Sequence, residues 1–173
     1  MANVENVLTE RRSVRSYKAE QIKDRELQAV LEAGLYAPSG RNRQCTVMVA
    51  TQNPEEIALM SRLNAGVMGT DSDPFYGAPT VIVVFADKEV YTHVEDGSLV
   101  MGNLLNAAYA EGLGACWIHR ARDVFEMPEG KELMKKWGVP ENYEGIGNCI
   151  LGYAEGGFPD ASPRREGRII ISK

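Results

Sequence analysis

The chain has 173 residues, of which 44% are hydrophobic and 25% charged, and its formal net charge is −5 at pH 7. This composition is typical of one globular domain, here residues 1–173, and argues against disorder, while the acidic balance argues against a nucleic-acid partner. No stretch approaches the roughly 18 apolar residues that a membrane span needs, so we expect a cytoplasmic protein with no membrane partner.

The first half of the chain alternates helical and strand-like patterns. Asp24 can cap a helix whose apolar positions recur at helical spacing until Pro38 stops it, and the apolar run 81–85 is typical of a central strand. Residues 66–78 are rich in Gly and Asp and are expected to form a mobile surface segment. The elements expected here are a helix over 4–9, a helix capped by Asp24 and stopped by Pro38, a helix over 54–63, a polar loop 38–44, and strands 46–50 and 79–86.

The second half contains the longest helical pattern, which follows Asp96 and ends near Gly112. Beyond it we expect strands 115–118, 146–153 and 168–172 and a helix over 128–137. Helices and strands do not alternate regularly, as they would in a doubly wound nucleotide-binding fold. The sequence therefore predicts an α+β fold with a single central mixed β-sheet flanked by helices.

The last expected strand contains three consecutive isoleucines, Ile169, Ile170 and Ile171. Such a strand exposes an apolar surface and unpaired backbone groups unless something covers it. It can complete the sheet of its own chain, or a partner subunit can cover it. The sequence leaves both alternatives open.

The three cysteines, Cys45, Cys116 and Cys149, form no C-x-x-C pair and cannot all pair with one another. This pattern fits a reducing compartment, and we interpret these residues as small buried apolar side chains.

Several common chemistries lack their motifs. The Gly-x-Gly pairs at 112–114 and 145–147 have no third glycine, and neither a G-x-x-x-x-G-K phosphate loop nor an H-E-x-x-H metal helix occurs. With His93 and His119 as the two histidines, a Ser-His-Asp hydrolase is poorly supported and we predict no metal site. A bound cofactor is the economical source of difficult chemistry.

Two clusters of arginines at opposite ends of an acidic chain indicate a bound anion, most simply a discrete phosphate. The first cluster includes Ser13, whose hydroxyl can share phosphate oxygens with guanidinium groups. Favourable interaction with a helix dipole explains part of this cluster, and the second cluster can equally be a solvated tail. The residues are Arg11, Arg12, Ser13 and Arg15 in the first cluster and Arg164 and Arg165 in the second.

The loop after the second helix has the composition of a polar clamp. Pro38 stiffens the helix exit, Ser39 and Gly40 permit close backbone approach, and the amides of Asn42 and Gln44 both donate and accept hydrogen bonds. Pro-Ser-Gly is also common turn material, so the loop alone does not establish a site.

Taken together, these segments resemble the nitroreductase family of FMN enzymes. The resemblance rests on five motifs in the family order, and it spans nearly the whole chain. They are Arg11-x-Ser13-x-Arg15, Ala37-Pro38-Ser39-x-x-Asn42-x-Gln44, the helix 96–108, the segment 112–118, and Ile150-Leu151-Gly152-Tyr153 with the Pro163-Arg164-Arg165 tail.

The resemblance implies an FMN site shared between the two subunits of a homodimer. Arg11, Ser13 and Arg164 match contacts to the phosphate and ribityl chain, with Arg12 and Arg165 beside them, and Arg15 matches the basic residue near the pyrimidine edge of the flavin. The resemblance implies that the other subunit supplies Pro38, Ser39 and Asn42, and that Gln44 of the same loop also binds the cofactor.

The segment Ile118, His119, Arg120 matches the backbone beside flavin N5. His119 is either a proton donor or a scaffold residue whose amide does the work, and we prefer the second interpretation. Phe75 and Tyr76 lie where the resemblance implies a substrate-covering segment, although aromatic residues before a strand are often packing. Departures from the family pattern include Cys45, at a position that is often proline.

The implied activity is that of an FMN-dependent oxidoreductase. NADH or NADPH would reduce the flavin at N5, and a small electron-poor acceptor such as a nitroaromatic or a quinone would then take the electrons. The alternatives are an enzyme reduced by a protein electron donor, an FMN storage or sensor protein without turnover, and an anion-binding scaffold that has lost the cofactor.

Overall fold

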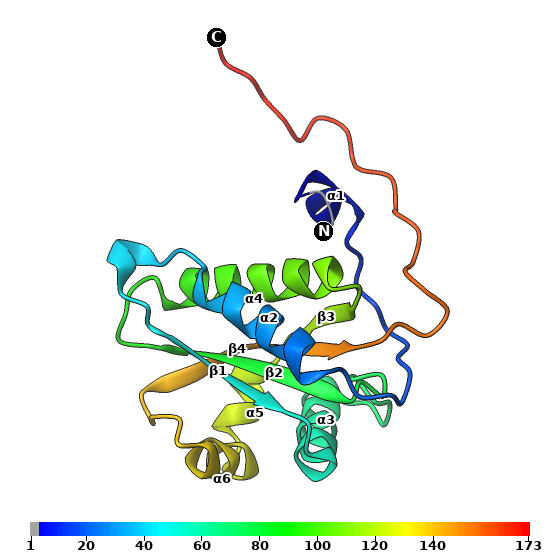
Figure 1. Cartoon of the computed structure of the whole chain (residues 1–173). Coiled ribbons are helices and arrows are strands. Elements are labelled where there is room, and N and C mark those ends of the chain that lie inside the picture. The colour runs from blue at the N-terminus through cyan, green and yellow to red at the C-terminus, as the bar shows by residue number, and fades with distance from the viewer. Residues whose placement is uncertain (1–3) are drawn as a thin grey trace.

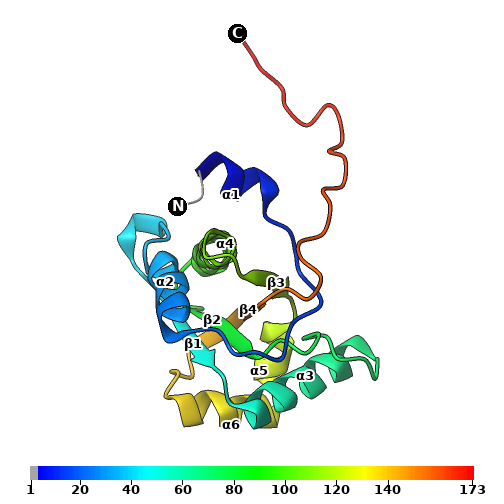
Figure 2. The same cartoon turned by 45° about the vertical axis from the view of Figure 1, so that its right-hand side comes forward.

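A four-stranded sheet separates two helical layers in the computed structural model, which describes residues 4–173 (Figure 1). The strand order is β1-β2-β4-β3. Helices α2 and α4 cover one face, with α1 beyond α4, and α3, α5 and α6 cover the other (Figures 1 and 2). The strands are β1 Thr46–Thr51, β2 Thr80–Asp87, β3 Gly114–Ile118 and β4 Tyr143–Gly152. The helices are α1 Val4–Glu10, α2 Asp24–Leu35, the 3-10 turn Gly40–Asn42, α3 Pro54–Met68, α4 His93–Ala110, α5 Ala121–Glu126 and α6 Pro128–Trp137.

Strand β2 forms the centre of the core because both of its faces are covered. Its side chains alternate between the two layers, as the period of a strand requires. Val81, Val83 and Phe85 pack with the α3, α5 and α6 layer, whereas Ile82 and Val84 pack with α2 and α4. A strand buried on both faces is a continuous apolar run in sequence, which is why the pattern predicted it.

The α+β class with a single sheet flanked by helices is confirmed. The predicted mixed sheet differs in detail, because the three strand pairs β1–β2, β2–β4 and β3–β4 are antiparallel. Among the described residues, parallel pairing occurs at one isolated bridge, between Ser13 and Ala115.

Helix α4 begins one turn earlier than the sequence predicted, at His93 with Thr92 as its N-cap residue. The side chain of Asp96 does not cap the helix. It instead faces the loop at 40–45, a contact between residues more than 50 positions apart. Helix α5 was not predicted, and α3 continues to Met68, five residues beyond the predicted end.

The prediction of a strand at 168–172 is wrong for a single chain, because these residues form no strand in the structure. After the bridge between Tyr17 and Ala154 the tail leaves the sheet, and Phe158 packs edge-on against Tyr109 of α4 (Figures 1 and 2). Its three isoleucines are 75–93% exposed. The tail therefore does not complete the sheet of its own subunit, and coverage by a partner is the alternative that stays a prediction.

Residues 66–78 are more ordered than expected because Asp73 organises them. Its carboxylate accepts hydrogen bonds from the backbone N–H of Phe75 at 2.8 Å and of Gly77 at 2.7 Å, and from the hydroxyl of Ser61 on α3. These bonds fold the segment back against α3 and bury Phe75.

Glu56 connects three elements on the α3 side of the sheet. Its buried carboxylate accepts hydrogen bonds from Thr51 at 2.6 Å, Lys136 at 2.8 Å and the Trp137 indole at 3.2 Å. Burial acts to raise the pKa of Glu56, but the bonds from Lys136, Thr51 and Trp137 outweigh it and hold the pKa below its ordinary value.

None of the helices within residues 4–173 is long and apolar enough to cross a bilayer.

Replacing Glu56 with Gln should destabilise the protein by about 1–3 kcal/mol, because a neutral amide cannot replace the ion pair and leaves buried donors poorly satisfied. The difference in free energy of unfolding between wild type and variant should have its full size above about pH 4.3, the ordinary pKa of Glu. It should shrink as the pH falls through the lowered pKa of Glu56 in the folded state. Urea unfolding of both proteins at pH 7 and at pH 3.5 measures this difference and its pH dependence. Glu55→Gln, an exposed neighbour, should change stability by under about 1 kcal/mol, and equal effects of the two variants would contradict the assignment.

Candidate functional site

The N-terminal arm, residues 11–18, crosses the ends of β3 and β4. Val14 N–H donates to the Ala115 carbonyl at 3.1 Å, and the Val14 side chain is buried. Gly114 makes room for it, because a Cβ at that position would lie 2.9 Å from the Val14 side chain. The arm is thereby fixed with Ser13 beside the edge strand β3.

Arg11 and Arg12 follow α1 but differ in their contacts. Arg12 Nη1 donates to the carbonyls of Thr9 at 2.9 Å and Arg11 at 2.7 Å, so part of Arg12 closes the carboxyl end of α1. Arg11 Nη1 and Arg12 Nε are buried N–H groups with no acceptor among the described residues. Buried donors are almost always satisfied, so these two indicate an acceptor outside the chain.

The Arg11 charge also acts on the thiol of Cys149 in β4. Burial raises the pKa of Cys149 to about 12, and the Arg11 guanidinium opposes that rise. Trp117, which packs against the core cluster containing Cys149, has a third buried N–H without an acceptor among residues 4–173. The part of the chain that the structure describes thus has three buried N–H groups without an acceptor, on Arg11, Arg12 and Trp117.

The turn after β3 is held by two buried asparagines. Asn148 Nδ2 donates to the Ile118 carbonyl at 3.2 Å, and Asn64 Nδ2 donates to the His119 carbonyl at 2.9 Å. Asn64 Oδ1 accepts from Arg120 Nε at 2.9 Å. Arg120 adopts a left-handed conformation with φ 73°, which a side chain other than glycine adopts only when its surroundings enforce it.

The side chain of His119 is exposed, whereas its carbonyl is fixed by Asn64. This geometry supports our preference for a scaffold role of His119, which remains a prediction.

The clamp loop, residues 38–45, is well defined at the other end of the molecule. Gln44 N–H donates to Ser39 Oγ at 3.0 Å, and the Gln44 side chain donates to Asn42 Oδ1 at 3.2 Å. Pro38 is exposed beside these residues. The loop also contacts α4, because Gly40 N–H donates to Oδ1 of Asp96 on that helix at 2.9 Å.

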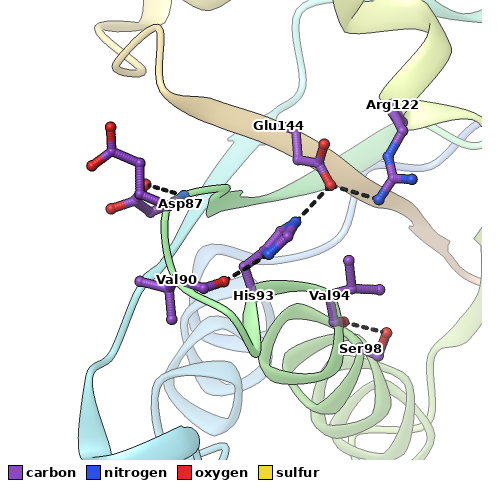
Figure 3. Close-up of polar contacts among 8 residues, drawn as sticks. Asp87, Val90, His93, Val94, Ser98, Arg122 and Glu144 are labelled. Carbon is purple, nitrogen blue, oxygen red and sulfur yellow. Dashed lines mark hydrogen bonds and ion pairs between the residues drawn. The ribbon is translucent and has the colours of Figure 1, made fainter.

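Figure 3 shows how the start of α4, next to this loop, is attached to the sheet. One ring nitrogen of His93, Nδ1, lies 2.7 Å from the Val90 carbonyl, and Nε2 lies 2.9 Å from Glu144 Oε1 in β4. Arg122 of α5 also binds this oxygen of Glu144. The first turn of α4, which also contacts the clamp loop through Asp96, is therefore anchored to the central strand β4.

Helix α4 separates the clamp loop from the N-terminal arm. Asp96, near the start of α4, binds the loop, and Tyr109, near its end, donates to Glu10 Oε2 at 3.2 Å. At 1.5 Å per residue these two positions are about 20 Å apart. Figure 1 shows the loop and the arm at opposite ends of the helix. One chain thus brings Arg11, Ser13 and β3 together but not the clamp.

The remaining candidate residues are less closely placed. Arg15 is exposed on the arm, and Arg164 and Arg165 are exposed on the tail. Phe75 is 1% exposed within the core, so its interpretation as a stacking group is corrected to packing. Tyr76 is 41% exposed and stays a candidate.

A cavity of about 890 Å³ lies between α3 and the segment 70–79. Its lining includes Arg62 and Gln52 but none of the arginines of the N-terminal arm. It is therefore distinct from the site at β3. Within residues 4–173, no three His, Cys, Asp or Glu side chains lie together as metal ligands.

Comparisons with known proteins identify the class to which this fold and this arm belong. The nitroreductase family profile matches residues 8–153. A relative from Archaeoglobus fulgidus, provisionally named NADH dehydrogenase/NAD(P)H nitroreductase, is 31% identical over 149 residues, 83% of this chain and 80% of the relative. The chain therefore belongs to the nitroreductase family.

Solved structures agree with this assignment. A nitroreductase with bound FMN from Bacteroides fragilis matches with a TM-score of 0.91 at 28% identity over 100% of both chains. A nitroreductase with bound FMN from Desulfitobacterium hafniense matches with a TM-score of 0.87 at 28% identity, covering 99% of this chain and 100% of that chain. Family and structural relatives together support an FMN-dependent oxidoreductase.

The N-terminal arm fits the phosphate of such a cofactor. Arg11 and Arg12 offer buried donors with no acceptor among the described residues, and Ser13 supplies a hydroxyl beside them. An unsatisfied buried donor costs about 1–3 kcal/mol, and an anionic acceptor would offset this cost with charge-assisted bonds.

Sequence reasoning missed Asn64, Asn148 and the contact role of Asp96. The available signal was a polar residue within an apolar pattern, since Asn64 follows Leu63 on the buried side of α3 and Asn148 interrupts the apolar strand β4. All three are at most 3% exposed.

Replacing Asn64 with Ala should destabilise the protein by about 1–3 kcal/mol and loosen the 118–120 turn, because the His119 carbonyl and Arg120 both lose their partner. Hydrogen–deuterium exchange should be faster at residues 118–121, and urea unfolding should show the loss of stability. Asn6→Ala, an exposed amide on α1, serves as the control. Unchanged exchange at the turn would show that Asn64 does not hold it.

Proposed function

We propose that this protein is a homodimeric FMN oxidoreductase that takes electrons from NADH or NADPH and reduces a small electron-poor acceptor such as a nitroaromatic or a quinone. The observation that carries the proposal is the buried Nη1 of Arg11, which lacks an acceptor among the described residues, two positions before Ser13 at the edge of β3. Family membership and FMN in two structural relatives support the cofactor.

Each part of the arm has a separate task in this proposal. Arg11, Ser13 and the free Nε of Arg12 bind the phosphate and the adjoining ribityl chain. Arg15 places a positive charge at the pyrimidine edge and favours the anionic reduced ring. Backbone groups of 118–120, fixed by Asn64 and Asn148, lie beside N5. The bound flavin supplies hydride and electron transfer.

The second subunit completes the site. The clamp loop of one chain cannot reach its own arm along α4, so Pro38, Ser39, Asn42 and Gln44 act on the flavin of the partner. Exposed apolar side chains on α1, α2 and α4 form the surface on which the subunits meet. They are Val4 at 71%, Leu8 at 65%, Leu35 at 72%, Tyr36 at 79% and Leu99 at 46% exposed.

The C-terminal tail crosses to the partner in the same assembly. Its exposed isoleucines gain a surface there, and the crossing carries Arg164 and Arg165 toward a phosphate. Tyr76 contacts the acceptor. Three free, buried cysteines suit a reducing cytoplasm.

The purified protein should be yellow, or become yellow with added FMN, and its flavin absorbance should bleach on anaerobic addition of NADH or NADPH. Reoxidation by a nitroaromatic or a quinone, followed in the same cuvette, tests the acceptor class. Flavin that binds but is not bleached by either nucleotide would favour a protein electron donor or a storage role. A protein that stays colourless with excess FMN would disprove the proposal.

Replacing Arg11 with Ala should weaken FMN binding by about tenfold to hundredfold, because charge-assisted bonds to the phosphate are worth about 1.5–3 kcal/mol. Fluorescence titration of the flavin-free protein measures the dissociation constant. The control is Arg62→Ala, which removes an exposed arginine of α3 and should leave the constant unchanged. Equal constants for both variants and the wild type would remove Arg11 from the phosphate site.

A further inference from the structure

Asp96 is a buried carboxylate whose contacts converge on the clamp loop. It is 3% exposed, and Oδ1 accepts a hydrogen bond from Gly40 N–H at 2.9 Å. Oδ2 accepts from Cys45 Sγ at 3.3 Å and from Thr92 Oγ1 at 3.0 Å. Two of the three donors therefore belong to the loop, more than 50 residues away in sequence, and they bracket its central part.

The loop between these two donors is strained. Arg41, Asn42 and Gln44 all adopt positive φ, at 55°, 54° and 48°. A left-handed conformation is unfavourable for a residue with a side chain, less so for Asn than for Arg or Gln, so this loop conformation is strained. Such strain persists only where the surroundings enforce it, and strained segments are found preferentially at binding sites.

The contact between the loop and α4 is close as well as polar. A Cβ at Gly40 would lie 2.5 Å from Thr92 Oγ1, so the loop backbone packs directly on the first turn of the helix. Inside the loop, Ser39 and Gln44 are hydrogen bonded to each other. The hydrogen bonds within the loop determine its conformation, and Asp96 attaches the loop to α4.

The carboxylate is in its charged form. Burial acts to raise the pKa of Asp96, but the hydrogen bonds from Gly40, Cys45 and Thr92, together with the Arg43 charge, outweigh it and hold the pKa below its ordinary value. An apolar side chain would fill this buried position at lower desolvation cost. The distinctive contribution of Asp96 is therefore to accept the hydrogen bonds that hold the loop.

We propose that Asp96 is a positioning residue of the flavin site, which holds the clamp loop of its own chain in the strained shape that binds FMN in the partner subunit. This inference rests on the proposed flavin function. Asp96 touches neither cofactor nor substrate and acts only through Gly40 and Cys45.

The first test measures FMN affinity in Asp96→Asn. The amide keeps the size of the side chain and can still accept from Gly40 N–H through its oxygen, but it has no charge, and Cys45 and Thr92 must then accept hydrogen bonds from its N–H groups instead of donating. The charge-assisted bonds that hold the loop are therefore lost. We expect the dissociation constant to rise about tenfold, while circular dichroism and sedimentation show a folded dimer. Thr92→Ala, which removes one hydroxyl bond, should raise the constant by about two- to fivefold and remains informative if Asp96→Asn does not fold.

Glu56→Gln is the matched control. Glu56 is also a buried carboxylate with three donors, but it lies on the opposite face of the sheet and does not touch the loop. General loss of stability affects both variants, whereas FMN affinity should fall only for Asp96→Asn. An equal loss of affinity in the two variants would overturn the positioning role.

The decisive test asks in which subunit Asp96 acts. A hybrid dimer with Arg11→Ala in one subunit and Asp96→Asn in the other, isolated with two affinity tags, has two different sites. If Asp96 acts on the partner, one site carries both substitutions and the other carries none, so one FMN binds with wild-type affinity per dimer. If Asp96 acts within its own subunit, both sites are damaged and no FMN binds tightly, which would overturn the inference.

Failure of the inference can be told apart from failure of the proposed function. A wild-type protein that does not bind FMN contradicts the function itself. A wild-type protein that binds FMN, together with an Asp96→Asn variant of equal affinity, contradicts only the role of Asp96.

Discussion

The length of α4 is the constraint on which the site depends. It keeps the N-terminal arm and the clamp loop about 20 Å apart within one chain, because a helix rises 1.5 Å per residue and cannot bend enough to join its own ends. In the proposed function, this separation is the reason that two copies of the chain form one site. Cofactor binding would then be coupled to assembly, since each chain supplies only half of the proposed site.

Buried polar side chains connect the core to the functional segments. Asn64 and Asn148 fix the turn after β3, while Asp96 fixes the clamp loop. Asn64 and Asp96 each reach from a helix into a loop, whose backbone groups have no ladder to satisfy them, and Asn148 reaches from β4 to the last residue of β3. The precise shape of the loops is therefore determined by a few hydrogen bonds that originate in rigid elements, which suits a site that must be formed before the ligand arrives.

The sequence predicted the elements that local pattern controls. The positions of α2 and β2 follow from apolar spacing, although Lys23 and not the predicted Asp24 is the N-cap residue of α2, and the five motifs in their order predicted the family. It did not predict the start of α4, because Asp96 is an N-cap residue by local rules and is recruited instead by a loop more than 50 residues away. The sequence also did not predict that the tail leaves the sheet. The strand propensity of Ile169–Ile171 does not reveal whether a sheet edge of the same chain is free to pair with this segment.

The candidate site was predicted as a set of residues but not as a geometry. Arg11 and Ser13 were identified by type and spacing, whereas the absence of an acceptor for Arg11 among the described residues is a property of the folded surroundings. Phe75 was misjudged for the same reason, because Asp73 turns the segment and places the ring inside.

Two of the thiols are chemically protected in a way that suits the proposed chemistry. Burial and the neighbouring Asp96 raise the pKa of Cys45 to about 11, and burial raises that of Cys149 to about 12. Thiolates are the form that attacks electrophiles, so at neutral pH both sulfurs are almost entirely protonated. Electron-poor compounds such as quinones alkylate exposed thiolates, so under the proposed function the shielding of these two cysteines would limit inactivation by the acceptors.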